Sequence, residues 1–391
     1  MPQHMQLPAP ANYSQRPLGR NLGKVLHRRR SMLTSRWVSH DEVGRGHWRG
    51  HGSLPSGGAR MKVVRLARNG GPEVLTYEEV PTPTPGEGQV RVRVKAIGLN
   101  FGDTVIRQGD APVRLEFPFI PCMEAAGVVE ALGPGVTGVG VGARVVVPLF
   151  VAGRLGGAAA EALVVETSLL VPLPDAISFE QGAAMMLQGL TALWMLAHVP
   201  PAGRAVLVHA AAGGVGSWLV QLARLKGARS VIATASTPEK LAVARRLGAD
   251  VVVSYAEPDW PARVRVETEG RGPDVIYDQV GGEVRRLGLE VLAIQGTLVI
   301  YGGAATHQLG ELDSAQVLGL YSRNQFVTGF SGWPLFGVPG LLARSYDELF
   351  TLVGSGQVEV LIGQRYPLAD LAQAHRALRA RETTGKVLLI P

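Results

Sequence analysis

Five short apolar segments alternate with helix-like segments in the second half of the chain, and this alternation constrains the fold more than any other feature. Parallel strands need a crossover connection, usually a helix, so strands that alternate with helices form a parallel sheet covered on both faces. We therefore predict an α/β fold with a doubly wound parallel sheet. The five strand segments are AVLVHA (205–210), SVIATA (230–235), VVVSY (251–255), DVIYDQV (274–280) and GTLVIYGG (296–303).

A glycine-rich turn follows the first of these segments, in the stretch HAAAGGVGSWLVQLA (209–223). Dinucleotide-binding turns have the pattern Gly-x-Gly-x-x-Gly, whose glycines permit a tight bend, a close approach to the pyrophosphate and close packing of the helix. Here Ala211 stands at the first glycine position, and Gly213 and Gly216 stand at the second and third. A tight turn in an α/β core is the alternative. As a cofactor site, the turn would bind the dinucleotide through Ala212, Gly213, Gly214, Val215 and Gly216.

The second strand segment ends without the acidic residue that binds the ribose of NAD in many dinucleotide sites. The stretch ATASTPEK (233–240) places Ser236 and Thr237 at the strand end and Lys240 one helical turn later. An acid would repel a 2′-phosphate, whereas hydroxyls and a lysine favour one, so we predict NADP(H) as the cofactor, bound through Ser236 and Lys240. A capping role of Ser236 and Thr237 for the next helix is compatible with this prediction.

The segment from Met61 to about residue 175 has a different pattern, with short β-rich runs separated by Gly/Pro turns. MKVVRLA is predicted as a first strand from residue 61, and VRVRV alternates with period two, as in a half-buried antiparallel strand. A helix is predicted after Ser178, with Gln181 completing a capping box. The tail from Tyr366 to Pro391 is predicted as a helix followed by a closing strand that returns to this first part of the chain.

The first 60 residues account for the net positive charge of the chain. They contain ten lysine and arginine residues and two acidic ones, whereas the whole chain of 391 residues has a net charge of +7, so the remainder is close to neutral. Three interpretations compete: a basic arm for nucleic acid or an anionic surface, a transit peptide, and an over-extended start with translation beginning at Met61. The near-neutral remainder argues against a nucleic-acid partner. No run of about 18 apolar residues suggests a membrane span.

Several stretches together resemble the zinc-independent quinone oxidoreductase (zeta-crystallin-like) branch of the medium-chain dehydrogenases/reductases. The resemblance implies a GroES-like β-rich domain built from both ends of the chain and a Rossmann domain between them. We expect an N-terminal extension (1–60), a first catalytic part (61–182), a Rossmann domain (183–336) and a return to the catalytic domain (337–391). The stretches are VLVHAAAGGVGSWLVQLARLKGA, GGPEVLTYEEVPTPTPGEGQVRVRVKAIGLNFGDTVIRQG, PCMEAAGVVEALGPGV, GARVVV, AISFEQGAAMMLQGLTA and TTGKVLLIP.

Zinc-dependent members of this superfamily bind their catalytic metal in three of these segments. By segment matching, the ligand positions fall on Asn100, Met123 and Gln188, none of which is a thiolate, imidazole or carboxylate. The single cysteine, Cys122, excludes a four-cysteine structural zinc site and any internal disulfide. The histidines of the body (His198, His209, His307, His375) lack ligand spacing and are interpreted as surface or turn residues. We predict no metal.

The expected nicotinamide end contains the residues that we assign to catalysis: Asn100, Asp103 and Gln188. Asn100 would orient the cofactor carboxamide or the substrate carbonyl, and Asp103 has the alternative role of holding its loop through backbone hydrogen bonds. Many relatives carry a tyrosine where this chain has Val105, which argues against a tyrosine acid. Thr191, one turn beyond Gln188, is expected to contact the cofactor.

The resemblance adds further contacts at both ends of the cofactor. It implies cofactor contacts of Tyr255, Tyr301, Gly302, Gly303 and Lys386, with surface placement as the alternative for Tyr255 and Lys386. It also implies a homodimer through an edge strand near residues 324–330.

These observations predict a cytoplasmic, NADPH-dependent, zinc-independent reductase that transfers hydride to a small-molecule quinone or α,β-unsaturated carbonyl. Without a metal, an acceptor must already be electron-poor, so that the site needs mainly proximity and a few hydrogen bonds. Two alternatives stay open: a non-enzymatic NADPH-binding protein with a structural, RNA- or vesicle-associated role, and an enoyl-thioester reductase.

Overall fold

The structure is a computed structural model that describes residues 58–304 and 312–391. The first 57 residues, on which the three N-terminal interpretations depend, lie outside the described residues, as does His307. Within the described ranges, no helix is both long and apolar enough to cross a membrane.

The alternating segments form the predicted parallel sheet. Its six strands follow the order β10-β9-β8-β11-β12-β13, and every neighbouring pair is parallel. The order reverses direction between β8 and β11, and in open α/β sheets ligands bind outside the carboxyl ends of the strands at such a switch point. The strands are β8 (Ala205–Val208), β9 (Ser230–Ala235), β10 (Val251–Ser254), β11 (Val275–Asp278), β12 (Thr297–Ile300) and β13 (Phe326–Gly329).

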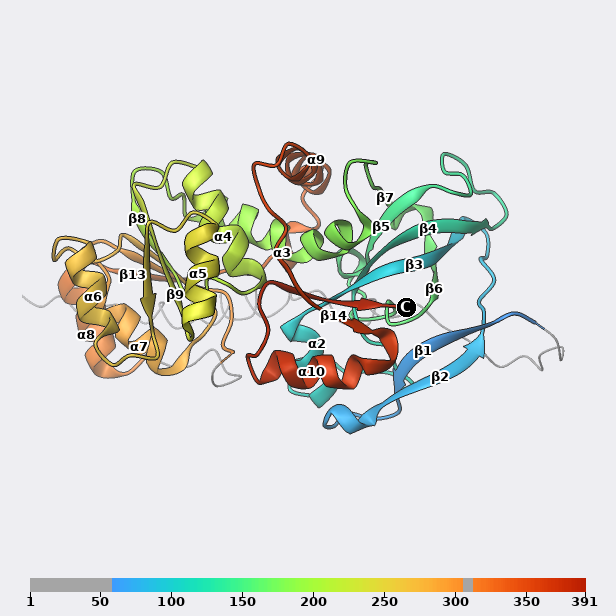
Figure 1. Cartoon of the computed structure of the whole chain (residues 1–391), viewed down its shortest axis with the longest axis horizontal. Coiled ribbons are helices and arrows are strands. Elements are labelled where there is room, and N and C mark those ends of the chain that lie inside the picture. Colours follow the sequence, from blue (N-terminus) through green and yellow to red (C-terminus); the bar gives the residue numbers. More distant parts are fainter. Residues whose placement is uncertain (1–57, 305–311) are drawn as a thin grey trace, which may run out of the picture. The chain divides into compact units, whose positions relative to one another are not determined.

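Helices connect these strands and lie on both faces of the sheet (Figure 1). The α5 helix begins after Thr237, whose side chain accepts a hydrogen bond from the Lys240 backbone N–H, so the predicted cap is confirmed. The connecting helices are α4 (Gly214–Leu225), α5 (Pro238–Arg246), α6 (Trp260–Glu267), α7 (Gly282–Val291) and α8 (Ser314–Arg323).

The first part of the chain forms an antiparallel strand pair and most of a second sheet, which is antiparallel except for its β14–β15 pair. The predicted first strand, β1 (Arg60–Leu66), pairs with β2 (Leu75–Pro81). A seven-stranded sheet has the order β14-β15-β3-β4-β5-β7, with β6 also paired to β3. Its strands are β3 (Gln89–Leu99), β4 (Glu124–Leu132), β5 (Arg144–Pro148), β6 (Ala162–Glu166), β7 (Val171–Pro172), β14 (Ile362–Pro367) and β15 (Lys386–Ile390).

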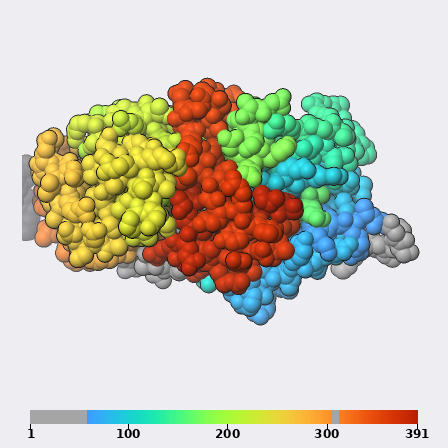
Figure 2. Space-filling view, in the orientation of Figure 1, coloured from blue at the N-terminus to red at the C-terminus, as the bar shows by residue number. Residues whose placement is uncertain are grey.

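The C-terminal strands therefore complete a sheet that begins near the other end of the described chain. β15 pairs antiparallel with β3, which precedes it by almost three hundred positions. Figure 2 shows the C-terminal residues, in red, covering the surface between the yellow helices and the cyan strands. The remaining elements, apart from α3, are α2 (Phe101–Gln108), α9 (Leu341–Gly354), α10 (Leu371–Arg379), η1 (Pro72–Val74), η2 (Leu149–Ala152), η3 (Thr167–Leu169), η4 (Trp333–Leu335) and η5 (Leu368–Asp370).

One long helix, α3 (Phe179–His198), packs between a helix of the parallel sheet and strands of the seven-stranded sheet. It begins at the predicted capping box, in which Ser178 accepts from the Gln181 N–H and Gln181 accepts from the Ser178 N–H. It contacts α4 on one side and β3 and β4 on the other. Most of its residues are buried, as expected of a helix that is apolar nearly all round. The helix thus carries Gln188 and Thr191 to the boundary between the two sheets.

Candidate active site

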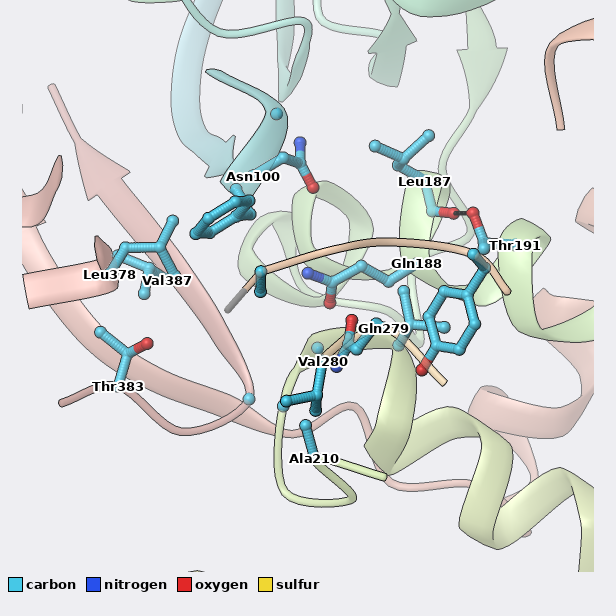
Figure 3. A pocket seen from close by; sticks show the side chains of 18 of the residues that line it. Asn100, Leu187, Gln188, Thr191, Ala210, Gln279, Val280, Leu378, Thr383 and Val387 are labelled. Carbon is cyan, nitrogen blue, oxygen red and sulfur yellow. Dashed lines mark hydrogen bonds between the residues drawn. The ribbon is translucent and has the colours of Figure 1, made fainter. Parts of the chain in front are cut away.

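A cavity of about 410 Å³ opens at the switch point of the parallel sheet. Residues that follow β8 and β11 line one side, and residues of α2, α3 and the C-terminal segment line the other. Figure 3 shows Asn100 on one side, Gln279 and Val280 on the other, and Gln188 between them. The volume lies in the range of small-molecule and cofactor sites, roughly 300–1,000 Å³.

The glycine turn forms the floor of this cavity. Gly213 is the N-cap of α4, and Ala212, Gly213, Gly214 and Val215 line the cavity. A helix N-terminus presents free N–H groups and a positive dipole end, which suit a pyrophosphate. Gly216 lies outside the lining and has the packing role of the third glycine, because a Cβ there would lie 2.3 Å from the Ala210 carbonyl oxygen.

The tight bend falls one residue earlier than the sequence pattern suggests. Ala210, and not Ala211, adopts the left-handed conformation, with φ 51°. Ala211 is fully buried, and its N–H donates to the Thr234 carbonyl oxygen at 3.0 Å. The chain therefore makes the bend with an alanine, which tolerates positive φ at a modest energetic cost.

A basic and hydroxyl-rich group lies at the end of the cavity formed by β9 and β10. Ser236, Lys240 and Tyr255 line it together with Arg381 from the C-terminal segment. The Lys240 ammonium donates to the Arg381 carbonyl oxygen, and burial together with the Arg381 charge lowers the pKa of Lys240. Two cations held side by side attract a dianion. Arg381 was missed from the sequence, where nothing distinguishes it from the neighbouring arginines of α10.

Asn100, Gln188, Thr191 and Tyr301 lie toward the other end of the cavity. The Thr191 hydroxyl donates to the Leu187 carbonyl oxygen at 2.7 Å, so it is engaged within its own helix. Gln188 lies against the glycine turn, since a Cβ on Gly214 would lie 2.0 Å from its side-chain nitrogen. Burial raises the pKa of Tyr301 well above its ordinary value, and its hydroxyl has no hydrogen-bond partner among the described residues.

Asp103 lies behind Asn100 and outside the lining of the cavity. Its Oδ2 accepts a hydrogen bond from the Asn100 backbone N–H at 2.7 Å, as part of the capping box of α2. This contact corresponds to the loop-holding role that the sequence analysis gave as the alternative. Burial raises the pKa of the Asp103 carboxyl to about 7.

Gly302 and Gly303 also lie outside the lining. They follow β12, and Gly302 is packed against Gln279, since a Cβ there would lie 3.2 Å from the Gln279 side chain. Gln279 itself lines the cavity and was missed from the sequence. Its only signal was its place directly after a buried strand.

Lys386 occupies a position that the sequence analysis did not expect. It is 1% exposed, so the alternative of a surface lysine is wrong, and it lies outside the lining of the cavity. Its ammonium is paired with Glu124, which is fully buried, and donates to Asn100 Oδ1 at 2.7 Å. Glu124 was also missed, although it directly follows Met123 in a segment that the zinc argument used.

The interpretation of the body histidines as surface or turn residues is wrong for His375, which is buried within α10, whereas His209 does lie in the turn after β8, although it is buried there. His209 and His375 are fully buried, and burial lowers their pKa values to about 4 and about 3. His209 Nδ1 and the Thr234 hydroxyl form a hydrogen bond of 2.8 Å, and His375 Nδ1 accepts a hydrogen bond from Arg107 Nε at 3.2 Å. Both are neutral packing residues.

The donor atoms around Asn100 do not suit a zinc ion. Asn100 and Gln188 offer amides and Met123 a thioether, and the ammonium of Lys386 already contacts the Asn100 oxygen. A divalent cation at this place would be repelled by that ammonium and would lack the thiolate and imidazole ligands that zinc prefers. Within 58–304 and 312–391, no group of three or more His, Cys, Asp or Glu side chains has a metal-binding arrangement.

Aromatic side chains form the wall near η4. Trp194 donates its indole N–H to the Ser345 hydroxyl at 2.8 Å, and its ring lies 5.6 Å from that of Phe336. Phe330 and Trp333 line the same part of the cavity. This wall is preorganised for a flat, apolar ligand, because tilted aromatic contacts hold the rings in place.

Comparison with known proteins gives matches over nearly the whole described chain. Residues 86–175 match the alcohol dehydrogenase GroES-like domain, and residues 214–332 match the zinc-binding dehydrogenase family. A quinone oxidoreductase of Pseudomonas aeruginosa is 40% identical over 337 residues, which cover 84% of this chain and 99% of that protein. A 2-haloacrylate reductase of a Burkholderia species is 36% identical, over 83% of this chain and 98% of its own.

A solved structure is similar over the same range. The crystal structure of Escherichia coli quinone oxidoreductase complexed with NADPH has a TM-score of 0.76 and 35% identity, and it covers 85% of this chain and 100% of its own.

Proposed function

The chain belongs to the quinone oxidoreductase family of the medium-chain dehydrogenases/reductases, and on this basis we propose that it is an NADPH-dependent reductase. It would transfer hydride, without zinc, to a quinone or an α,β-unsaturated carbonyl. The relatives named as quinone oxidoreductase and 2-haloacrylate reductase both support an electron-poor, conjugated acceptor.

The pairing of Lys240 with Arg381 carries the choice of NADPH. Both residues line the end of the cavity beyond β9, where Ser236 and Tyr255 add hydroxyl groups. NADP(H) differs from NAD(H) by a 2′-phosphate, and charge-assisted hydrogen bonds are the strongest means of recognising it. The glycine turn at the start of α4 would hold the pyrophosphate.

The bound cofactor supplies the hydride, and the chain supplies position and electrostatics. Asn100 offers an amide at the expected nicotinamide end, and Gln188 offers a second amide beside the glycine turn. Trp194, Trp333 and Phe336 form an apolar wall for the ring of the acceptor. Hydrogen bonds to a carbonyl oxygen that gains negative charge favour the transition state over the ground state.

Steady-state NADPH oxidation with quinones and with enones, measured side by side, tests this function. We expect turnover with at least one class and a higher kcat/KM with NADPH than with NADH. Tight NADPH binding without turnover of any acceptor would instead favour the non-enzymatic alternative. A CoA-linked enoyl thioester belongs in the same panel, and its exclusive use would favour the enoyl-thioester reductase.

We also propose that two copies pair through β13. This strand lies at the edge of the sheet, and Phe326 on it is 58% exposed. On the neighbouring α8, Leu318 and Tyr321 are 63% and 81% exposed. An open strand edge beside apolar side chains is a template for pairing with a second strand.

Light scattering coupled to size exclusion tests the pairing. We expect the wild type to have twice the mass of one chain and Phe326→Glu to have the mass of one. Val266→Glu, which changes an apolar residue of α6 that is 76% exposed, is the matched control and should stay dimeric. A monomeric wild type would refute the pairing.

The chain's only cysteine, Cys122, bears on location. A chain with one cysteine forms no internal disulfide and so does not need an oxidising compartment for folding. We therefore propose a cytoplasmic enzyme. Recovery of the native protein in the cytoplasmic fraction is the expected result.

A further inference from the structure

A buried group of charged and amide side chains lies directly behind Asn100. The Glu124 carboxylate accepts hydrogen bonds from Asn100 Nδ2 at 2.7 Å and from the Leu187 backbone N–H at 3.1 Å, and it is paired with the Lys386 ammonium. Lys386 also donates to Asn100 Oδ1 at 2.7 Å. The exposed fractions of the residues Glu124, Lys386 and Asn100 are 0%, 1% and 7%.

The backbone around this group leaves room for it. Gly98 lies on β3 beside Glu124, and a Cβ on Gly98 would lie 2.7 Å from the Glu124 Cγ and 2.6 Å from the Ala183 carbonyl oxygen. Any larger residue at position 98 would therefore displace the carboxylate or α3. The pair joins β4 to β15 and, through Leu187, to α3.

Stability alone is a poor reason to retain such a pair. Removing two charges from water is costly, and a buried ion pair is often no more stable than apolar residues of the same size. Buried polar groups that are fully hydrogen-bonded do, however, fix one arrangement of the side chains that they contact. The only side chain that both members of this pair contact at the cavity, among the described residues, is Asn100.

We propose that Lys386 and Glu124 are positioning residues that hold the Asn100 carboxamide in a single orientation at the reacting end of the cavity. The inference rests on the proposed reductase function, because it assigns Asn100 to that reaction. Neither Lys386 nor Glu124 touches the cavity itself, so both act through Asn100.

The chemistry of the pair determines which way the amide faces. The amide oxygen faces an ammonium, which only donates, and the amide nitrogen faces a carboxylate, which only accepts. The reversed orientation would bring N–H groups to the ammonium and the oxygen to the carboxylate, and both contacts would be repulsive.

A double-mutant cycle tests the coupling. Its three variants are Asn100→Ala, the pair variant Glu124→Gln/Lys386→Met, which leaves no unpaired buried charge, and the combination of all three changes. The measured quantity is the single-turnover rate of NADPH oxidation with saturating acceptor. We expect Asn100→Ala and the pair variant each to lower this rate roughly 10- to 100-fold, and the combination to be no slower than Asn100→Ala alone.

A matched control separates positioning from general damage to the fold. Arg107 is a buried cation of α2 that donates to the Gly70 carbonyl oxygen and to His375 and lies outside the cavity. Arg107→Met should lower the melting temperature and leave the single-turnover rate within about twofold of the wild type. Rate losses that multiply in the combined variant, or a pair variant with the wild-type rate, would overturn the proposal.

A crystal structure of the pair variant gives a readout that does not depend on turnover. We expect the Asn100 side chain to occupy more than one orientation there, and a single unchanged orientation would overturn the proposal. If the wild type reduces no acceptor, the proposed function fails while this structural result still decides the positioning role. If the pair variant does not fold, Glu124→Gln alone, which keeps the side-chain volume and Lys386, takes its place in both experiments.

Discussion

Lys240→Met should convert an NADPH-selective site into one that scarcely distinguishes the two cofactors. The Lys240 side chain is half-buried beside Arg381, and its burial together with the Arg381 charge lowers the pKa of Lys240. A 2′-phosphate between the two would neutralise that repulsion, and a hydrogen bond between charged groups contributes about 1.5–3 kcal/mol. At 1.36 kcal/mol for each factor of ten, the Kd for NADPH should rise roughly 10- to 150-fold.

The size of the effect should depend on the cofactor and on salt. NADH has no 2′-phosphate, so its Kd should change by less than about twofold. The ratio of the Kd for NADH to the Kd for NADPH should therefore fall by almost the same factor as the affinity for NADPH. Because the cations are partly exposed, ionic strength should screen them, and the wild-type preference for NADPH should shrink between 0.05 and 0.5 M salt by several-fold, as the Debye length falls below roughly 5 Å.

Isothermal titration of both cofactors against wild type and variants measures these ratios. Lys226→Met is the matched control, because Lys226 is the C-cap residue of α4, lies outside the cavity and pairs with Glu348 at 3.0 Å. It should leave both Kd values unchanged. An equal loss of NADPH and NADH affinity in Lys240→Met would mean that Lys240 acts through the fold, and an unchanged ratio would refute the assignment of the 2′-phosphate to this end of the cavity.

Two further predictions concern the protein around the site. Gly385 has φ 59°, and a Cβ there would lie 2.3 Å from the Leu361 carbonyl oxygen. Gly385→Ala should therefore lower the free energy of unfolding, measured by urea titration, by roughly 2–4 kcal/mol. Gly354→Ala is the control and should not lower it, because a Cβ on Gly354 would meet no described atom within 4 Å. Burial raises the pKa of Asp103 from 3.8 to about 7, so the folded state binds the carboxyl proton more tightly than the unfolded chain does. The contribution of this proton to the free energy of unfolding is complete below about pH 4 and is lost as the pH rises to about 7. It amounts to at most about 4 kcal/mol. Asp103→Asn should thus gain stability relative to the wild type across that interval, and parallel pH profiles of the two proteins would contradict the assigned burial.

The parts of the fold that follow from local patterns could be predicted from the sequence. The alternation of strands and helices predicted the parallel sheet, and the capping box at Ser178 and the cap at Thr237 predicted where α3 and α5 begin, because these signals depend on residues a few positions apart. The edge strand near residue 326 came from the family resemblance and not from composition. The Ala210 bend was misplaced by one residue, because a glycine pattern does not specify which backbone unit takes the positive φ.

The parts of the site that depend on long-range packing could not be predicted. Lys386 reaches Asn100 across 286 positions, and no local pattern distinguishes a lysine that will be buried beside a carboxylate from one at the surface. His209 and His375 show the same limit, since histidines are most often at least partly exposed. The Lys386 contact depends on the sheet register that brings β15 beside β3.

The C-terminal segment connects the two ends of the cavity, and this has a consequence for how variants there should behave. Arg381 lies at the basic end, the Gly385 N–H donates to the Ala212 carbonyl oxygen of the glycine turn at 2.7 Å, and Lys386 holds Asn100. A displacement of Gly385 would therefore move a cofactor-selecting cation and a positioning cation together. Changes in this segment should alter cofactor preference and hydride-transfer rate at once, whereas changes on α5 should alter the preference alone.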